Sequence, residues 1–417
     1  MILEFRCSNF RSIKNEVCFS SLAGTDTSYE DRLIEYSKYR ILRTAVIYGA
    51  NGSGKSNLIR AIEFMRALVC ESLKHEPGQT IYQPVHKLSD DNEDTSFRMQ
   101  FVRNNIRYAY GFALSNNAVK EEYLYFFPNG KQVRIFERAG MQIIPGNQYK
   151  ASFGLATDAL KTNRLFLSCA ANFSSVTDIE EVFQFFRDDI VVYSAYNMPQ
   201  PDIWRNYSIN KLQKDEAVKR IFLKILNELN TGIINVSTKH EKVRFEDEKV
   251  SKDFPEELKI LLANQELNRY EAKVKYELFE TELVEEESAG INKLFEILCP
   301  IIDIVQCGKV LICDELEYGL HEAVVVKILN IFNALPSNNQ AQLFFSTHDT
   351  SLLDKELFRR DQIWFTELDE IRSTKLYSLS EIRNVRKTEN IEKGYLAGKY
   401  GAIPLMNQGI KNFFEED

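Results

Sequence analysis

The stretch "IYGANGSGKSN" at residues 47–57 contains, from Gly49 to Ser56, the pattern G-x-x-x-x-G-K-[ST] of a phosphate-binding loop. Because so short a pattern also occurs by chance, its flanks decide the interpretation. Residues 45–48 are apolar and partly β-branched, which predicts a buried parallel strand before the loop. The apolar residues after the loop recur on one face of a helix: Leu58, Ile62, Met65 and Val69. This is the order that phosphate binding requires, and the alternative is a plain glycine turn before a helix.

The loop has the chemistry to hold a nucleoside triphosphate. Its glycines let the backbone curl so that N–H groups point at phosphate oxygens, and the helix N-terminus adds partial positive charge. Lys55 is expected to reach the β- and γ-phosphates, and the Ser56 hydroxyl to ligate Mg²⁺. The predicted ligands are therefore a nucleoside triphosphate and Mg²⁺, and the family resemblance given below implies that the nucleotide is ATP. The predicted contacts from this segment are Gly49, Asn51, Gly52, Ser53, Gly54, Lys55, Ser56 and Asn57.

A second predicted strand ends in acidic residues. Residues 309–321 read "KVLICDELEYGLH", in which a buried-strand run at 310–313 is followed directly by Asp314 and Glu315. A strand-terminal aspartate can enter the Mg²⁺ shell, and the next glutamate can polarise the attacking water. Two carboxylates that close an apolar strand are costly unless a cation lies there. An acidic helix start is the alternative, but it leaves the preceding buried run unexplained.

A third predicted strand leads to a histidine. In "AQLFFSTHDTSLLD", residues 341–354, the run 343–345 predicts a strand that is followed closely by His348. Ligands of open α/β sheets gather at the carboxyl ends of the parallel strands. We therefore predict a catalytic role for His348, although a lone histidine is more often structural. Two further strand-like stretches, at 360–368 and 373–382, are expected at the edge of the sheet.

Between these motifs the chain changes pattern. Alternating residues at 96–114, with Asn104 and Asn105 as a turn, and at 121–138 predict an antiparallel sheet. From 151 to 280 the pattern is mostly helical and has no sustained heptads, so no long coiled coil is expected. We therefore expect three segments: 1–150 with the glycine loop and the antiparallel sheet, 151–280 as a mainly helical insert, and 281–417 with the remaining motifs.

Two stretches of the insert are informative. Residues 178–196 place apolar side chains on one helical face. Residues 208–220, "SINKLQKDEAVKR", are rich in lysine. A solvated helix face explains this composition, and a contact with nucleic acid or a partner protein is the alternative.

Composition excludes several classes of protein. The 417 residues are enough for two or three lobes, and 44% hydrophobic with 27% charged residues is ordinary for a globular chain. The net charge of −8 argues against a generally cationic nucleic-acid-binding surface but allows a local basic groove. Seven scattered cysteines without a CxxC argue against a disulfide framework or a zinc site. No secretory leader or apolar span is evident, so we expect a cytoplasmic protein without membrane contact.

Together these motifs resemble the ABC-class ATPase head shared by SMC, RecF and OLD-type proteins. "EESAGINKLF" (286–295) resembles a degenerate signature motif that retains Ser288 and Gly290. The tail "GYLAGKYGAIP" (394–404), with "RRDQIWFTE" (359–367), resembles the RloA-like, AbiL-like branch of bacterial defence ATPases. The other matches are "NFRSIK" (9–14) with the family's opening, "GANGSGKSNL" (49–58) with Walker A, "LICDELEYGLH" (311–321) with Walker B and the D-loop, and "STHD" (346–349) with the H-loop.

The resemblance implies a fold and a mechanism. The fold is α/β, a P-loop NTPase of the ABC/SMC-head type with an antiparallel β subsheet and a mainly helical insert. Two heads pair head-to-tail as a homodimer around two ATP molecules, and higher oligomers are compatible with this arrangement. One head supplies Lys55, Ser56, Asp314, Glu315 and His348, and the other reaches the γ-phosphate through Ser288 and Gly290.

Two further residues are nucleotide-site candidates by resemblance. Arg11 is expected to reach the nucleotide. Gln83 is a candidate metal ligand of the Q-loop type, and a polar surface residue is the alternative there. The sequence also departs from the family: the signature lacks the double glycine of transporter ATPases, and Glu322 stands where a proline often follows the histidine.

The function expected from the resemblance is an ATPase that senses or regulates in bacterial anti-phage defence. A separate toxic effector, a nuclease or a toxin, is expected because the chain has no nuclease motif of its own. The alternative is a RecF-like DNA-binding ATPase of repair or recombination. A transporter subunit is disfavoured by the signature and the long insert, and a GTPase by "INKLF" at 291–295, which lacks the aspartate of the guanine-reading motif.

Overall fold

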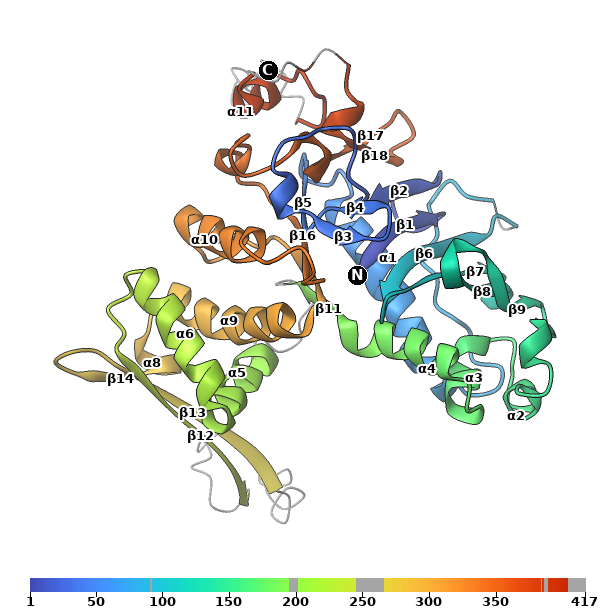
Figure 1. Cartoon of the computed structure of the whole chain (residues 1–417), viewed down its shortest axis with the longest axis horizontal. Coiled ribbons are helices and arrows are strands. Elements are labelled where there is room, and N and C mark those ends of the chain that lie inside the picture. Colours follow the sequence, from blue (N-terminus) through green and yellow to red (C-terminus); the bar gives the residue numbers. More distant parts are fainter. Residues whose placement is uncertain (91, 195–201, 245–265, 384, 386–388, 404–417) are drawn as a thin grey trace, which may run out of the picture. The chain divides into compact units, whose positions relative to one another are not determined.

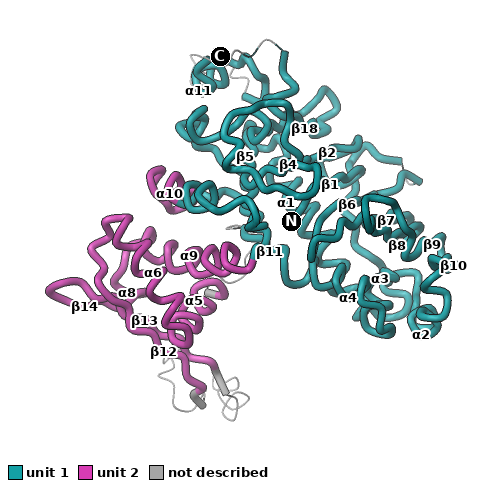
Figure 2. Tube along the Cα trace, viewed as in Figure 1, with its two compact units in different colours: residues 1–194, 308–316, 328–417 teal, residues 195–307, 317–327 magenta. Residues whose placement is uncertain are grey.

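The computed structural model (Figure 1) describes residues 1–90, 92–194, 202–244, 266–383, 385 and 389–403. The chain forms two compact units, shown in Figure 2: unit 1 contains residues 1–194, 308–316 and 328–417, and unit 2 contains 195–307 and 317–327. The division expected from the sequence, at residues 150 and 280, differs from these boundaries and stays a prediction.

A mostly parallel sheet forms the centre of unit 1. Its strands stand in the order β11-β15-β16-β5-β17-β18, and every pair is parallel except the edge pair β17–β18. The strands predicted from the sequence are all present, together with one that was not predicted. Their bounds are β5 Thr44–Gly49, β11 Ile190–Ser194, β15 Val310–Asp314, β16 Gln342–Ser346, β17 Ile363–Leu368 and β18 Thr374–Ser378.

The unpredicted strand is β11, which the sequence analysis placed within a helix over 178–196. The helical part ends earlier: α4 (Thr177–Gln184) continues into a π-helical turn, Phe185–Asp189, before the strand begins. The β-branched run at 190–192 pairs in parallel with β15. Pairing in the sheet therefore overrides the helical periodicity, and the predicted helix is correct only up to this turn. Residues 195 and 196 lie outside the described part.

A seven-stranded antiparallel sheet, also in unit 1, has the order β10-β9-β8-β7-β6-β1-β2. Asn104 and Asn105 both have positive φ, 46° and 60°, which is the conformation of a tight hairpin turn and confirms the predicted β6–β7 hairpin. A two-stranded sheet, β3 Ile34–Tyr36 and β4 Tyr39–Ile41, stands apart. The strands of the large sheet are β1 Ile2–Ser8, β2 Val17–Ser20, β6 Thr95–Arg103, β7 Ile106–Ser115, β8 Ala118–Phe126, β9 Val133–Ala139 and β10 Gln142–Pro145.

One hydrophobic core joins the two large sheets of unit 1 through helix α1 (Lys55–Glu71). The predicted stripe Leu58, Ile62, Met65 and Val69 is buried in this core, between residues of both sheets. Phe19 of β2 packs on Trp364 of β17, with ring centroids 5.2 Å apart. The remaining helices of this unit are α2 Gly154–Asp158, α3 Phe166–Phe173 and α11 Ile391–Leu396, and α10 (Glu322–Asn333) is divided between the units.

Glu122 of β8 attaches α3 to the antiparallel sheet. Its carboxylate is buried and accepts hydrogen bonds from the N–H groups of Phe166 and Leu167, at 2.6 and 2.9 Å, where α3 begins. Arg138 and the Tyr110 hydroxyl also contact it. A helix start leaves N–H groups without partners and favours negative charge. Burial raises the pKa of Glu122, and these donors oppose that rise.

Unit 2 combines helices with a three-stranded antiparallel sheet, so the mainly helical insert of the sequence analysis also contains a substantial sheet. The apolar face of the sheet, with Val236 and Val274, shares a core with Phe222 and Phe295 of the helices. Strands β12 and β13 pair over their whole lengths. The bounds are α5 Asp202–Lys214, α6 Glu216–Glu228, β12 Asn235–Arg244, β13 Glu266–Lys275, β14 Glu280–Glu282, α8 Leu283–Glu286 and α9 Ala289–Cys307.

The lysine-rich stretch 208–220 lies on α5 and α6 of this unit. Lys211 is within 3.8 Å of Asp215 and 3.6 Å of Asp303. Asp215 also caps α6 by accepting from the N–H groups of Ala217 and Val218. These contacts agree with the solvated helix face and give no support to the nucleic-acid alternative.

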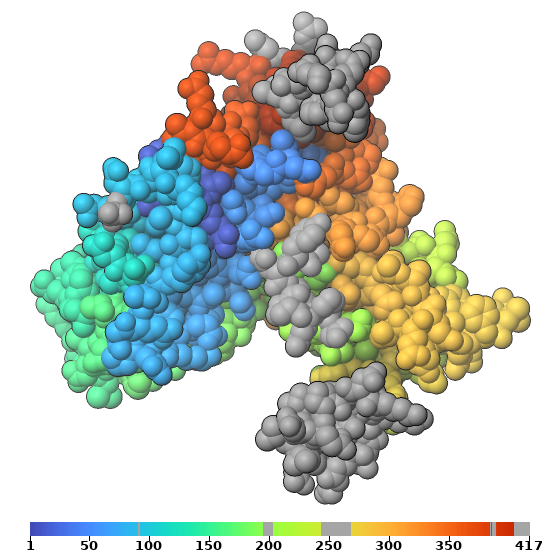
Figure 3. Space-filling view, turned by 180° about the vertical axis from the view of Figure 1, so that it is seen from behind, coloured from blue at the N-terminus to red at the C-terminus, as the bar shows by residue number. Residues whose placement is uncertain are grey.

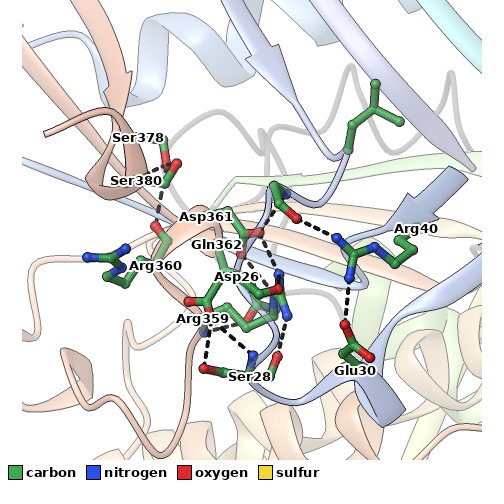
Figure 4. A network of polar contacts seen from close by, with 12 residues as sticks. Asp26, Ser28, Glu30, Arg40, Arg359, Arg360, Asp361, Gln362, Ser378 and Ser380 are labelled. Atoms are coloured by element: carbon green, nitrogen blue, oxygen red, sulfur yellow. Dashed lines mark hydrogen bonds and ion pairs between the residues drawn. The ribbon is translucent and has the colours of Figure 1, made fainter. Parts of the chain in front are cut away.

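A buried arginine fixes the loop at residues 24–28 of unit 1 to the sheet (Figure 4). Arg359 is 1% exposed and forms two hydrogen bonds with Asp361, at 2.9 and 2.8 Å. It also donates to the backbone carbonyls of Asp26 and Ser28. Asp361 in turn accepts from the N–H of Gly24 at 2.8 Å. Nearby, the half-exposed Arg40 donates to the carbonyl of Gly24 and to Glu30.

We predict that Arg359→Met lowers the free energy of unfolding by about 3–5 kcal/mol, because it leaves the carboxylate of Asp361 buried without its partner. Arg40→Ala is the matched control, since it removes a more exposed guanidinium that contacts the same loop from β4, and it is expected to cost about 0–1 kcal/mol. Urea unfolding of both variants followed by circular dichroism measures the difference. Equal losses of unfolding free energy in the two variants would contradict the stabilising role of the buried Arg359–Asp361 pair.

Candidate functional site

The glycine loop connects β5 to α1 in unit 1. The strand ends at Gly49, and the helix begins at Lys55. Gly52 and Gly54 have φ of 77° and 110°, a region that side-chain-bearing residues rarely adopt. A Cβ on Gly54 would lie 2.1 Å from the Thr374 hydroxyl, whereas a Cβ on Gly52 would meet nothing within 4 Å. Gly54 is thus required by the neighbouring strand, and Gly52 lies on the open side of the loop.

The last two strands of the sheet brace this loop. The hydroxyls of Ser53 and Thr366 of β17 are 2.6 Å apart, and the Thr374 hydroxyl of β18 donates to the carbonyl of Ser53 at 3.0 Å. The side chain of Ser53, a predicted nucleotide contact, is therefore used to hold the loop. In Figure 3 the surfaces from the N-terminal (blue) and C-terminal (orange and red) parts of unit 1 adjoin. This is expected because β5, the strand that leads into the loop, lies between β16 and β17.

Lys55 lies across the loop. Its side chain is only 5% exposed, and its ammonium donates to the carbonyls of Gly49 and Ala50, at 2.8 and 3.3 Å. Burying an ammonium is costly without compensating partners. An ammonium held beside a glycine loop and the start of a helix is an arrangement that an anionic phosphate group fits.

Ser56 and Asp314 meet at the carboxyl ends of the parallel strands. The Ser56 hydroxyl donates to Asp314 Oδ1 at 3.1 Å, and the Ser346 hydroxyl donates to the same oxygen at 2.6 Å. Asp314 is 2% exposed. A hydroxyl and a carboxylate are oxygen ligands of the kind Mg²⁺ prefers, together with phosphate oxygens and waters. Within the described residues no three His, Cys, Asp or Glu side chains group as a metal site. The fit of this pair to Mg²⁺ rests on the chemistry of its two oxygen donors.

Glu315 and His348 form the next part of the site. Nε2 of His348 lies 3.5 Å from Oε1 of Glu315. Glu315 has φ of 53°, and its N–H donates to the Ser346 hydroxyl at 2.9 Å. The hydroxyl of the buried Tyr48 donates to the carbonyl of Asp349 at 3.0 Å and fixes the turn that carries His348. The predicted strand-terminal acids and histidine are thus brought together.

The opening motif lies beside the start of α1. Asn57 donates to the Ser12 hydroxyl at 2.7 Å, so its side chain holds this segment. Arg11 is exposed, and its N–H donates to the carbonyl of Pro84 at 2.6 Å, so the Gln83 loop lies against it. Oε1 of Gln83 is buried and has no hydrogen-bond partner among the described residues. Asn51 is exposed on the loop. The roles of these residues toward nucleotide stay predictions.

Ser288 and Gly290 belong to unit 2. The Ser288 hydroxyl accepts from the N–H of Ile291 at 3.3 Å, at the start of α9. A Cβ on Gly290 would lie 3.6 Å from the carbonyl of Gly319. The chain a few residues beyond Glu315 therefore packs beside the signature-like motif. Asn292, which follows the signature-like serine and glycine, donates to the carbonyl of Leu283 at 2.9 Å and fixes the helix start.

Sequence reasoning missed the residues that support this site: Ser12, Ser346, Thr366 and Thr374. A polar residue at the end of an otherwise apolar strand was the available signal, as in "QLFFS" at 342–346. That signal does not reveal which neighbour a hydroxyl will contact, because the partners lie on other strands.

One family model matches part of the chain. Residues 45–142, less than half of the chain, match the family model described as "AAA domain, putative AbiEii toxin, Type IV TA system". The match begins in β5 and runs through the antiparallel sheet to β10. Among curated proteins, none matches the chain.

Solved structures similar to the chain include SMC head domains. One, from Thermotoga maritima, is 14% identical, with 90% of this chain and 98% of that chain covered and a TM-score of 0.41. Another, from Pyrococcus furiosus and bound to the C-terminal domain of ScpA, is 12% identical, with 95% and 98% covered and a TM-score of 0.43.

The expected fold class is confirmed. The chain is an α/β protein of the P-loop NTPase type with an antiparallel sheet beside the parallel one. The glycine loop and the family match support an ATPase that binds nucleotide. In the described residues, no helix is both long and apolar enough to cross a membrane.

We predict that Gly54→Ala lowers the melting temperature more than Gly52→Ala. Both changes force a side chain into left-handed backbone, at a cost of about 1–2 kcal/mol each. Only the change at Gly54 also drives a methyl group into the Thr374 side chain. Differential scanning calorimetry of the two variants provides the test, and a larger shift for Gly52→Ala would show that the loop is packed differently.

Proposed function

We propose that the protein is a Mg²⁺-dependent ATPase that acts as a sensor or regulator in bacterial anti-phage defence, together with a separate toxic effector. The contact between Ser56 and Asp314, beside the ammonium of Lys55, is the observation that carries the ATPase part. It brings together a hydroxyl at the start of α1 and a carboxylate at the end of β15, far apart in the sequence, beside the glycine loop.

The side chains support a division of labour in hydrolysis. Lys55 and the N–H groups of the loop bind and orient the phosphates. Ser56 and Asp314 hold Mg²⁺, which supplies charge neutralisation on the phosphate oxygens when bound. Glu315 accepts a proton from the attacking water, and His348, 3.5 Å from Glu315, orients that carboxylate.

We further propose that two copies pair through bound ATP. Ser288 and Gly290 of one copy contact the γ-phosphate held by Lys55 of the other, as in the ABC-class heads that the sequence resembles. Arg11 reaches the nucleotide, and Gln83 approaches the metal from its loop, where its buried Oε1 lacks a protein partner among the described residues. Loss of the γ-phosphate then separates the heads, so nucleotide state sets dimer geometry.

The defence role is supported by the family description. That description names a toxin of a type IV toxin–antitoxin system, and in this chain it matches the segment with the glycine loop and the antiparallel sheet. We propose that the effector is a separate nuclease or toxin and that both act in the cytoplasm. Expression of the chain in bacteria with and without its neighbouring reading frame, followed by phage challenge, tests this role. Protection by the chain alone would contradict a separate effector.

We predict that Lys55→Ala abolishes ATP binding, because the phosphates lose the buried cation of the loop. Isothermal titration with Mg·ATP measures the loss directly. Lys355→Ala removes an exposed lysine of the same unit and is expected to bind as the wild type does. Unchanged affinity in Lys55→Ala would refute the phosphate-binding assignment.

We predict that Glu315→Gln retains ATP affinity but slows hydrolysis by about 10²–10⁴-fold, as expected when a general base is removed. The same variant accumulates ATP-bound dimers, which light scattering detects. Glu356→Gln, at an exposed acid of unit 1, serves as the control. Normal turnover in Glu315→Gln would show that another group activates the water.

A further inference from the structure

Ser346 occupies the point where the two halves of the site meet. It is the last residue of β16, which lies between β15, the strand of Asp314, and β5, the strand that leads into the glycine loop. In the sheet register it pairs with Ile47 of β5. Its carbonyl accepts from the N–H of Leu316 at 3.3 Å, just beyond the acidic pair.

The Ser346 hydroxyl uses both of its hydrogen-bonding capacities. Every residue of β16 is buried, and Ser346 is 0% exposed, a place where an unpaired hydroxyl is costly. It donates to Asp314 Oδ1 at 2.6 Å and accepts from the N–H of Glu315 at 2.9 Å. One hydroxyl therefore contacts the side chain of the first acid and the backbone of the second.

For Asp314 this contact fixes the orientation of the carboxylate. Oδ1 accepts from Ser346 and from Ser56, and the Ser346 contact is the shorter, 2.6 against 3.1 Å. Hydrogen bonds from outer residues orient metal ligands and affect metal affinity. Ser56 is itself a candidate ligand, so Ser346 is the partner that holds Asp314 independently of the ion.

For Glu315 the same contact stabilises an unfavourable backbone. A φ of 53° is costly for a residue with a side chain. Without the hydroxyl, the N–H of Glu315 loses its hydrogen-bond acceptor, which favours relaxation of the backbone. Relaxation would move the Glu315 carboxylate from its place 3.5 Å from His348.

We propose that Ser346 is a positioning residue that sets Mg²⁺ affinity through Asp314 and hydrolysis through Glu315. The inference rests on the ATPase function proposed above. It assigns no contact between Ser346 and the nucleotide, so nucleotide binding without metal is independent of it.

The test measures three quantities in Ser346→Ala: ATP affinity in EDTA, the Mg²⁺ concentration for half-maximal hydrolysis, and kcat at saturating Mg²⁺. We expect unchanged affinity in EDTA, a Mg²⁺ requirement raised about 10–100-fold, and a lowered kcat. Ser346→Thr keeps a hydroxyl and is expected to restore the Mg²⁺ requirement. Ser168→Ala is the control, because it removes another fully buried, hydrogen-bonded hydroxyl of unit 1, away from the site.

Each outcome decides the proposal. A folded Ser346→Ala with wild-type Mg²⁺ requirement and kcat overturns the proposal. A loss of ATP affinity in EDTA as large as the change in Mg²⁺ requirement also overturns it, because that result indicates a merely structural role. If Ser346→Ala does not fold, Ser346→Cys, a weaker donor of similar size, must show an intermediate Mg²⁺ requirement. A wild-type protein that hydrolyses no ATP overturns the proposed function together with this inference, whereas an active wild type with an unaffected variant overturns this inference alone.

Discussion

The hydrogen bond between Ser56 and Asp314 joins residues that are 258 positions apart in the chain. It forms only if β5, β16 and β15 stand side by side, in parallel, with their carboxyl ends level. The order of the strands in the sheet satisfies this condition. A shift of one residue in either pairing would turn the side chain of Asp314 or Ser346 to the other face of the sheet. The register of three strands is thus the constraint on which the candidate site depends.

Buried polar side chains outside the site hold the starts of β5 and β16 and a nearby loop. Arg359 and Asp361 hold the loop at 24–28, and the amide of Gln362 donates to the carbonyl of Thr44, where β5 begins. Gln342, at the start of β16, contacts the backbone of Ile2 and so links β16 to the first strand of the antiparallel sheet. Each group is costly to bury alone, and each has a partner on another segment. Their shared effect is to fix strand ends.

The sequence was sufficient for the strands and the loop because their signals are local. An apolar run before the glycine loop predicted β5, and apolar runs that end in polar residues predicted β15 and β16. The spacing after Lys55 predicted the buried face of α1. β11 was not predicted, because its four apolar residues continue a helical pattern. Only the pairing with β15 distinguishes a strand from a helix in this segment. Ser346, Thr366 and Thr374 were missed for a similar reason: a hydroxyl has no periodicity, and its partner lies on a strand distant in sequence.

The neighbours of β5 in the sheet, β16 and β17, begin at residues 342 and 363, whereas β5 itself ends at residue 49. During synthesis on the ribosome, the glycine loop therefore leaves the exit tunnel long before the strands that flank it exist. The hairpins of β6 to β9 join consecutive segments and are able to form early, but the parallel sheet must wait for the synthesis of β15 to β18. A nascent chain would acquire its phosphate-binding site only after these strands have emerged, so a product truncated before them would carry the motif without a complete site.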